Sequence, residues 1–185
     1  TFRWYGEADP IPLAYIRQIP AMRGIVAALY ELDPAETWPV ARLRAPRSRI
    51  EDYGLEFRVV ESIPVHEDVK LGLPSRDGRI EAFIGSMKAV GEALVPRSRR
   101  TGSEAPPVVT YNVMPVFDWL RTDLVLRNPD GSTSLYYDQG RVDATDRFED
   151  SFDLPGWLTR YGRDEQAALV SRYRELGPDE LWGTT

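Results

Sequence analysis

The sequence of 185 residues is 42% hydrophobic and 28% charged, which is ordinary for a globular protein and enough to bury a sizeable core. Its 23 Lys and Arg against 29 Asp and Glu give a formal net charge of -6, without the positive excess that nucleic-acid binding requires. The chain has no cysteine, which excludes disulfides and thiolate metal sites, and no apolar run approaches the roughly 18 residues of a membrane span.

These limits leave an ordinary globular protein. The first residues, TFRWYGEADP, lack the basic and then apolar segments of a secretory signal, so we expect a cytoplasmic location. Neither a nucleic acid nor a membrane is expected as a partner.

Short strands and helical segments alternate from the first residues onward. FRWYG (2–6) predicts a short strand, and PLAYIRQI (12–19) predicts a helix because its apolar residues recur on one side. GIVAALY (24–30) is a continuous apolar run, which is typical of a strand buried on both faces of a parallel sheet.

The alternation continues as far as residue 113. A helix is predicted over 39–54, although Pro46 should kink or break it. A strand at 55–62, a long polar loop, a helix with an apolar stripe at 77–94 and a strand at 106–113 follow.

The pattern changes in the last third of the chain. Residues 96–107 predict a solvated connector, and 124–138 predict a β-hairpin around the turn residues 128–131. A further helix is predicted over 164–176, which Gly177 follows.

Strands that alternate with helices favour an α/β fold with a parallel sheet and right-handed crossovers. The roughly four βα units are half of the eight in a closed (β/α)₈ TIM barrel. We therefore predict a partial (β/α)₈ TIM barrel in a single domain, 1–185, with a β-hairpin flap after the fourth strand at 114–141 and a C-terminal helical segment at 143–182. Half a barrel leaves two sheet edges exposed, so a homo-oligomer is expected.

Polar and aromatic residues gather where the predicted strands end. Parallel α/β folds bind ligands at the carboxyl ends of their strands, because the loops that leave there converge. The strand-end residues are Trp4, Tyr5, Tyr30, Glu61, Tyr111 and Asn112. This set suits a polyhydroxylated or carboxylated small molecule, although strand ends of many proteins look similar.

His66 is the one histidine, and its pKa range suits proton transfer or metal ligation. Glu67, Asp68 and Lys70 beside it could orient a substrate. The alternative interpretation of His66 is a solvated loop residue. One histidine with scattered carboxylates does not make a recognisable metal-ligand set.

Asp118, Arg121 and Asp123 follow the fourth predicted strand together with Trp119. An arginine in this place could bind a substrate carboxylate. The alternative is a local ion pair that stabilises the flap, and Trp119 would then pack within the flap.

Several sequence segments, taken in chain order, resemble the N-terminal half of bacterial mannonate dehydratase, the metal-dependent type with a xylose-isomerase-like barrel. They run from residue 1 to about residue 138: FRWYG, GIVAALY, VVESIPVHEDVKLGLPSRD, YNVMPVFDWLRTDL and PDGSTSLYYD. The resemblance implies dehydration of D-mannonate to 2-keto-3-deoxy-D-gluconate with Mn²⁺ or Fe²⁺. The family's metal ligands lie in the C-terminal half of its barrel, so none is expected in this chain.

The same resemblance implies roles for individual residues. It implies catalytic roles for His66 and Asn112. It implies substrate contacts for Trp4, Tyr5, Gly6, Lys70, Asp118, Trp119, Arg121 and Asp123.

Two other functions stay open at this point. The chain could be a truncated or non-catalytic remnant that binds a sugar acid or a partner protein. It could also be another sugar isomerase or epimerase of the same barrel superfamily.

Overall fold

The computed structural model describes residues 1–98, 106–113, 121–144 and 162–176. Two compact units contain them, Thr1–Val113 and Met114–Thr185. The single-domain organisation stays a prediction. Among the described residues, none of the helices combines the length and the apolar composition that crossing a bilayer requires.

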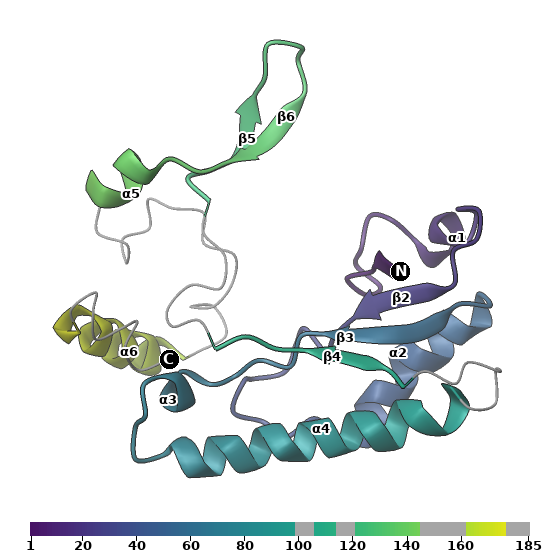
Figure 1. Cartoon of the computed structure of the whole chain (residues 1–185), viewed down its shortest axis with the longest axis horizontal. Coiled ribbons are helices and arrows are strands. Elements are labelled where there is room, and N and C mark those ends of the chain that lie inside the picture. Colours follow the sequence, from purple (N-terminus) through teal and green to yellow (C-terminus); the bar gives the residue numbers. More distant parts are fainter. Residues whose placement is uncertain (99–105, 114–120, 145–161, 177–185) are drawn as a thin grey trace. The chain divides into compact units, whose positions relative to one another are not determined.

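A four-stranded parallel sheet forms the first unit (Figure 1). Its strands lie in sequence order: β1 (Phe2–Arg3), β2 (Gly24–Ala27), β3 (Glu56–Glu61) and β4 (Val108–Thr110). The four predicted strands and their parallel pairing are therefore confirmed, although each strand is shorter than its apolar run. All residues of β2 are buried, as its continuous apolar run predicts.

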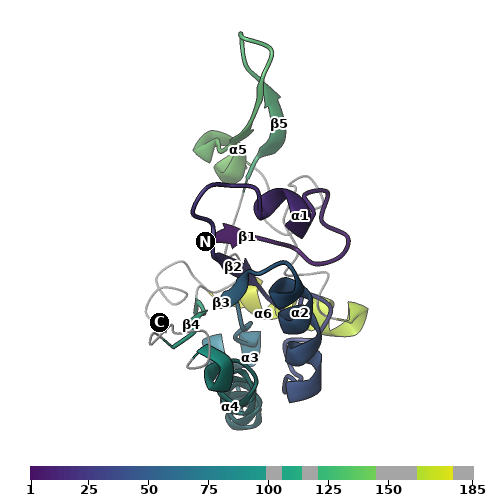
Figure 2. The same ribbon diagram turned by 90° about the vertical axis from the view of Figure 1, so that its right-hand side faces the viewer.

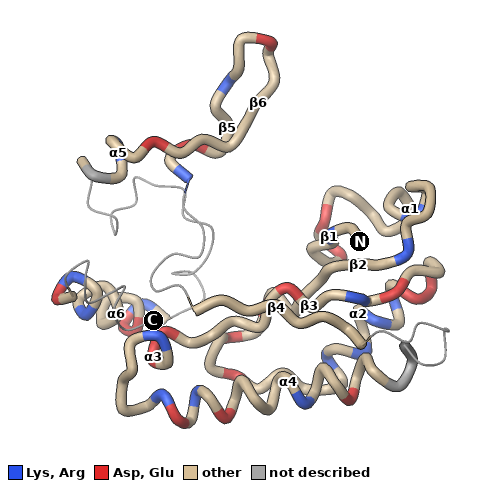
Figure 3. The backbone as a smooth tube through the Cα atoms, in the orientation of Figure 1, with Lys and Arg blue, Asp and Glu red and all other residues tan. Residues whose placement is uncertain are grey.

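Helices in the connections between the strands cover one face of this sheet. They are α1 (Leu13–Ile16), α2 (Val40–Asp52) and α4 (Arg76–Ser98), and Figure 2 shows them on the same side of the strands. Right-handed crossovers between parallel strands in sequence order require this one-sided placement. Both signs of charge occur along α4 (Figure 3), as expected for a helix with one face in water.

The hydrophobic core lies between the sheet and these helices. The strands contribute Ile25 and Ala27 from β2 and Phe57 and Val60 from β3. The register between β2 and β3 shifts after Ile25, so the spacing of core residues differs between the two strands. The helices contribute Leu43 and Ile50 from α2 and Val90 from α4. The core is therefore one-sided, and the alternate strand residues point to the opposite face.

Helix α2 continues through Pro46, so the predicted break at that residue is wrong. Proline removes one backbone donor, the N–H that would bind the Arg42 carbonyl, but packing fixes the rest of the helix. Leu43, Arg47 and Ile50 are buried on its inner face. The Arg47 guanidinium also donates to the Ala93 carbonyl of α4, which ties the two helices together.

Two other expectations need correction. The predicted polar loop after β3 contains a short helix, α3 (Glu67–Lys70), which hydropathy did not reveal. Helix α4 extends to Ser98, so residues 96–98 of the predicted connector are helical. Helix α3 starts at the N-cap His66 and has no apolar stripe, whereas the apolar stripe of α4 ends at Leu94, before the helix does.

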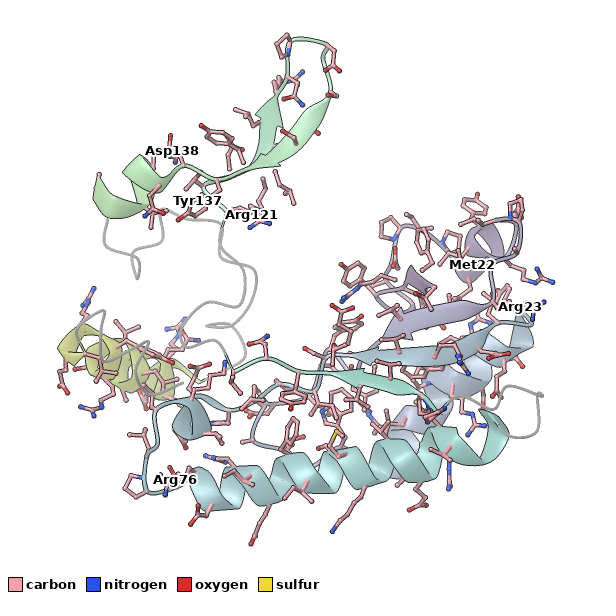
Figure 4. All side chains as sticks on the ribbon, viewed as in Figure 1. Met22, Arg23, Arg76, Arg121, Tyr137 and Asp138 are labelled. Carbon is pink, nitrogen blue, oxygen red and sulfur yellow. The ribbon has the colours of Figure 1, made fainter. Side chains whose placement is uncertain are left out.

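In the second unit, β5 (Asp123–Arg127) and β6 (Thr133–Tyr136) pair antiparallel and confirm the hairpin expected at 124–138. Figure 4 labels Arg121, Tyr137 and Asp138, which adjoin these strands in sequence. The hairpin is followed by α5 (Gln139–Ala144), which was not predicted, and by α6 (Arg163–Glu175), which confirms the last predicted helix.

Ser86 provides a test of how α4 packs on the first unit. Its buried hydroxyl accepts a hydrogen bond from the backbone N–H of Trp38 at 2.9 Å and donates to the Ala82 carbonyl at 3.0 Å. Ser86→Ala should lower the free energy of unfolding by about 1–3 kcal/mol, because the buried Trp38 N–H loses its acceptor. Urea denaturation measures this change. Ser48→Ala, at an exposed position of α2, is the control. Equal losses of unfolding free energy in both variants would contradict a stabilising role for the Ser86 hydrogen bonds.

Candidate functional site

Three strands of the sheet end in a polar residue on the face away from the helices. Arg3 ends β1, Glu61 ends β3 and Thr110 ends β4. Glu61 pairs directly with Thr110 in the strand register. Their neighbours in sequence, such as Val60, pack into the core, so these three side chains project from the other face. We call them the strand-end row.

The Arg3 and Glu61 side chains form an ion pair that reaches across β2. Arg3 Nη1 also donates to the Glu61 carbonyl at 3.4 Å, and its guanidinium carbon lies 5.5 Å from the centre of the Tyr5 ring. Burial by itself lowers the pKa of the Arg3 guanidinium, but Glu61 and Tyr30 outweigh that effect and the pKa is raised. Arg3 is therefore a permanent, oriented cation at the carboxyl edge of the sheet.

Tyr30 follows β2 and completes this edge. Its hydroxyl donates to the Trp4 carbonyl at 3.4 Å, and its ring centre lies 5.6 Å from that of Tyr5. Burial raises the pKa of Tyr30, and this effect exceeds the lowering by the nearby Arg3. The phenol therefore keeps its proton at neutral pH and acts as a hydrogen-bond donor.

Three of the predicted substrate residues, Trp4, Tyr5 and Gly6, line a cavity of about 610 Å³ together with Tyr30 and one face of α2. The Trp4 side chain is buried in the core cluster. The backbone N–H of Trp4 donates to the Val26 carbonyl at 2.9 Å. Gly6 has a φ of 95°, a conformation that glycine adopts at little cost and that turns the chain away from β1.

His66 is buried, so the alternative of a solvated loop histidine is wrong. It is the N-cap of α3, and its Nδ1 accepts a hydrogen bond from the Asp68 N–H at 3.0 Å. With Nδ1 as the acceptor, Nε2 is the ring nitrogen left to carry hydrogen and to act as a donor.

The charged residues after His66 form close pairs. Lys70 Nζ lies 2.6 Å from Glu67 Oε1 in a buried ion pair. Asp68 accepts from the Ser75 hydroxyl at 2.8 Å and from Arg79 at 3.3 Å. Each carboxylate therefore has a defined partner, and the turn is rigid at the end of β3.

The described parts of the chain contain no group of three or more His, Asp or Glu side chains that could hold a metal ion. The Nδ1 atom of His66 and the carboxylates of Glu67 and Asp68 are engaged as set out above. The residues described here do not fit a divalent-metal site.

Asn112 comes two residues after Thr110 at the end of β4. The Ile63 N–H donates to the Thr110 carbonyl at 3.3 Å, so the segments that leave β3 and β4 start side by side. Trp4 to Gly6 thus follow β1, His66 and Lys70 lie in the connection after β3, and Asn112 follows β4. That these residues form one site stays a prediction.

The remaining predicted residues belong to the second unit or lie outside the described residues. In the hairpin, Asp123 Oδ1 accepts from the Val125 N–H at 2.8 Å, within the irregular register of β5. Arg121 directly precedes Thr122, whose N–H donates to the Tyr136 carbonyl at 2.9 Å. Asp118 and Trp119 lie outside the described residues.

Sequence reasoning missed Arg3 and Thr110. It searched the residues after each strand, whereas these two are the last residues within their strands. The available signal was the alternation of faces, since Arg3 follows Phe2 and Thr110 follows Val109, both of which pack on the core. Strands of two or three residues are too short for that alternation to be recognised in sequence.

Comparisons with known proteins agree over the whole chain. The family model described as D-mannonate dehydratase (UxuA) matches residues 1–184. A mannonate dehydratase of Streptococcus uberis is 41% identical over 182 residues, which make up 98% of this chain and 49% of that protein. One from Streptococcus suis is 42% identical over 183 residues, or 98% of this chain and 47% of that protein.

A solved structure gives the same result. The crystal structure of mannonate dehydratase from Streptococcus suis serotype 2 matches 99% of this chain and 46% of that chain, with a TM-score of 0.76 and 39% sequence identity. This likeness confirms the predicted α/β fold with a parallel sheet. The chain spans about half the length of the curated relatives it matches. Since the family model matches almost every residue, the chain belongs to the D-mannonate dehydratase (UxuA) family.

Proposed function

We propose that this chain supplies the substrate-binding part of a mannonate dehydratase, which converts D-mannonate to 2-keto-3-deoxy-D-gluconate. The observation that carries the proposal is the family match over residues 1–184. The strand-end row supports it, because a sugar acid needs a cation for its carboxylate and polar groups for its hydroxyls.

In the proposed architecture the first unit forms the first four βα units of a (β/α)₈ barrel. The sequential strand order, the helices on one face and the half-length coverage of the relatives support this arrangement. The strand-end row would then face the barrel interior. The β5–β6 hairpin would act as a flap that brings Arg121 and Asp123 to the substrate.

The reaction removes the C2 proton beside the carboxylate, expels the C3 hydroxyl as water and converts the resulting enol to the ketone. Negative charge develops on the carboxylate side as the C2 proton leaves. Arg3 would bind this carboxylate, and Glu61 and the Tyr5 ring would hold the guanidinium in place. Tyr30, whose proton is donated to the Trp4 carbonyl, would accept a hydrogen bond from a substrate hydroxyl.

His66 and Asn112 are proposed to contact the substrate from the ends of β3 and β4. With Nδ1 engaged by the Asp68 N–H, His66 would donate through Nε2–H to a substrate oxygen. Lys70 would lie beside it, and its ion pair with Glu67 would fix its position. Trp4, Tyr5 and Gly6 would shape the wall that follows β1, and Asp118 and Trp119 would add contacts from the flap.

The divalent cation is proposed to be Mn²⁺ or Fe²⁺. Because the described residues do not fit a metal site, we assign its ligands to other residues and derive no step through it. We further propose a cytoplasmic homo-oligomer. The exposed apolar side chains of Val108, Tyr111 and Val113 on and beyond the edge strand β4 favour association.

Turnover of D-mannonate tests the proposed function. The protein should bind D-mannonate. Where the metal ligands are also supplied, it should form 2-keto-3-deoxy-D-gluconate with Mn²⁺, and chelation should abolish this activity. Protein mass in solution, measured in parallel, reports the oligomer. A folded protein that neither binds nor converts D-mannonate would favour a non-catalytic remnant, and conversion of ketoses instead would favour an isomerase.

Arg3→Ala should raise the KM for D-mannonate about 10- to 100-fold, since a hydrogen bond to a charged group contributes about 1.5–3 kcal/mol. Steady-state kinetics measure this change. Arg58→Ala is the matched control, because Arg58 lies on the same sheet but within β3. Equal KM values for the two variants would remove Arg3 from the site.

Substitutions of His66 separate its structural and functional roles. His66→Ala should lower the free energy of unfolding by about 0.5–2 kcal/mol through loss of the N-cap, whereas His66→Asn should retain most of the stability because asparagine also caps helices. Thermal unfolding reports this difference. Both variants should lose turnover if Nε2–H contacts the substrate, and full activity in His66→Asn would restrict His66 to capping.

A further inference from the structure

The cavity beside α2 differs chemically from the strand-end row. Part of its lining is made of small and apolar residues from the helix face and both strand ends: Trp4, Ala27, Ala28, Leu29, Ala45 and Pro46. Two tyrosines and four charged residues also line it: Tyr5, Tyr30, Glu7, Glu31, Arg42 and Arg49. A ligand for this volume of about 610 Å³ therefore needs an apolar body for the first set and a charged group for the second.

The cavity lies where the helix between two neighbouring strands is short. The helix in the β1–β2 connection, α1, has only four residues, whereas α2 has 13 and α4 has 23. The short helix leaves space above the ends of β1 and β2, next to α2. The α2 face that borders this space has Ala45 and Pro46 at its centre, which are too small to fill it.

Two arginines flank these small residues on the same face of α2. Arg42 Nη2 lies 2.6 Å from Glu31 Oε1. Arg49 Nε lies 2.9 Å from Glu7 Oε1. All four residues line the cavity. These ion pairs are exposed, so each contributes little to stability and exchanges readily. Each glutamate carboxylate marks a place where the carboxylate of a ligand could bind an arginine.

Of the two arginines, Arg49 is the better oriented to bind a ligand carboxylate. Its guanidinium carbon lies 5.3 Å from the centre of the Tyr53 ring, which keeps the group oriented when Glu7 leaves. Glu7 is 69% exposed and follows Gly6 in a loop, whereas Arg49 is anchored on a helix. The aromatic rings of Tyr5 and Tyr30 line the same space and suit a flat ligand.

We propose that this cavity binds a small aromatic carboxylate, with the ring against its apolar lining and the carboxylate on Arg49 in place of Glu7. This site goes beyond the proposed dehydratase function. It borders the proposed sugar-acid site through Trp4, Tyr5, Gly6 and Tyr30, but its carboxylate-binding residue is Arg49 and not Arg3. The ligand needs no hydroxyl groups, which separates it from the sugar acid expected at the strand-end row.

Fluorine NMR titration of the full chain with 4-fluorobenzoate tests the proposal. We expect saturable binding that Arg49→Gln weakens about tenfold, the effect of one hydrogen bond between charged groups. Glu7→Gln should tighten binding, because it removes the competing carboxylate. A gain in affinity cannot result from misfolding.

Arg44→Gln is the matched control. Arg44 is on the same helix and pairs with Glu92 at 3.3 Å, but it does not line the cavity, so affinity should be unchanged. Ala45→Leu should weaken binding by filling the space. No saturable binding to the folded protein, equal affinities of Arg49→Gln and Arg44→Gln, or weaker binding by Glu7→Gln would overturn the proposal, and none of these results would bear on D-mannonate turnover.

Discussion

The arrangement of the first unit depends on the handedness of its crossovers. Four parallel strands in sequence order with right-handed connections must carry their helices on one face. Apolar side chains of that face form the core with α1, α2 and α4, while the opposite face is left to residues such as Arg3 and Glu61. The same parallel order brings every strand's carboxyl end to one edge, where residues far apart in sequence meet.

That edge holds two environments of different chemistry. The strand-end row is half-buried and the turn from His66 to Lys70 is largely buried, and the charges of both are paired and hydrogen-bonded. The cavity beside α2 combines small apolar residues with two tyrosines and two ion pairs, in which Arg42 and Arg49 are the cations. A sugar acid matches the first environment and an aromatic carboxylate matches the second, because each buried polar group of a ligand requires a partner.

Some features could be predicted because local pattern and tertiary structure agree. The apolar run of β2 indicated a strand buried on both faces, and the stripe of α4 indicated a helix on the sheet. Other features depend on contacts that hydropathy does not encode. Pro46 did not break α2, since Leu43 and Ile50 hold the helix against the core. Helix α3 went unnoticed because its start depends on His66 acting as the N-cap.

The sequence by itself determined the alternation of strands and helices, the parallel sheet, the family resemblance and the position of Trp4, His66 and Asn112 in the segments that follow strands. These follow from periodicity and from residue order, which are local properties. Only the tertiary structure decided that Arg3 pairs with Glu61 across β2, that His66 is buried with its Nδ1 engaged, and that α2 borders a cavity. Those facts depend on register and on packing between distant segments, which hydropathy and spacing along one chain do not specify.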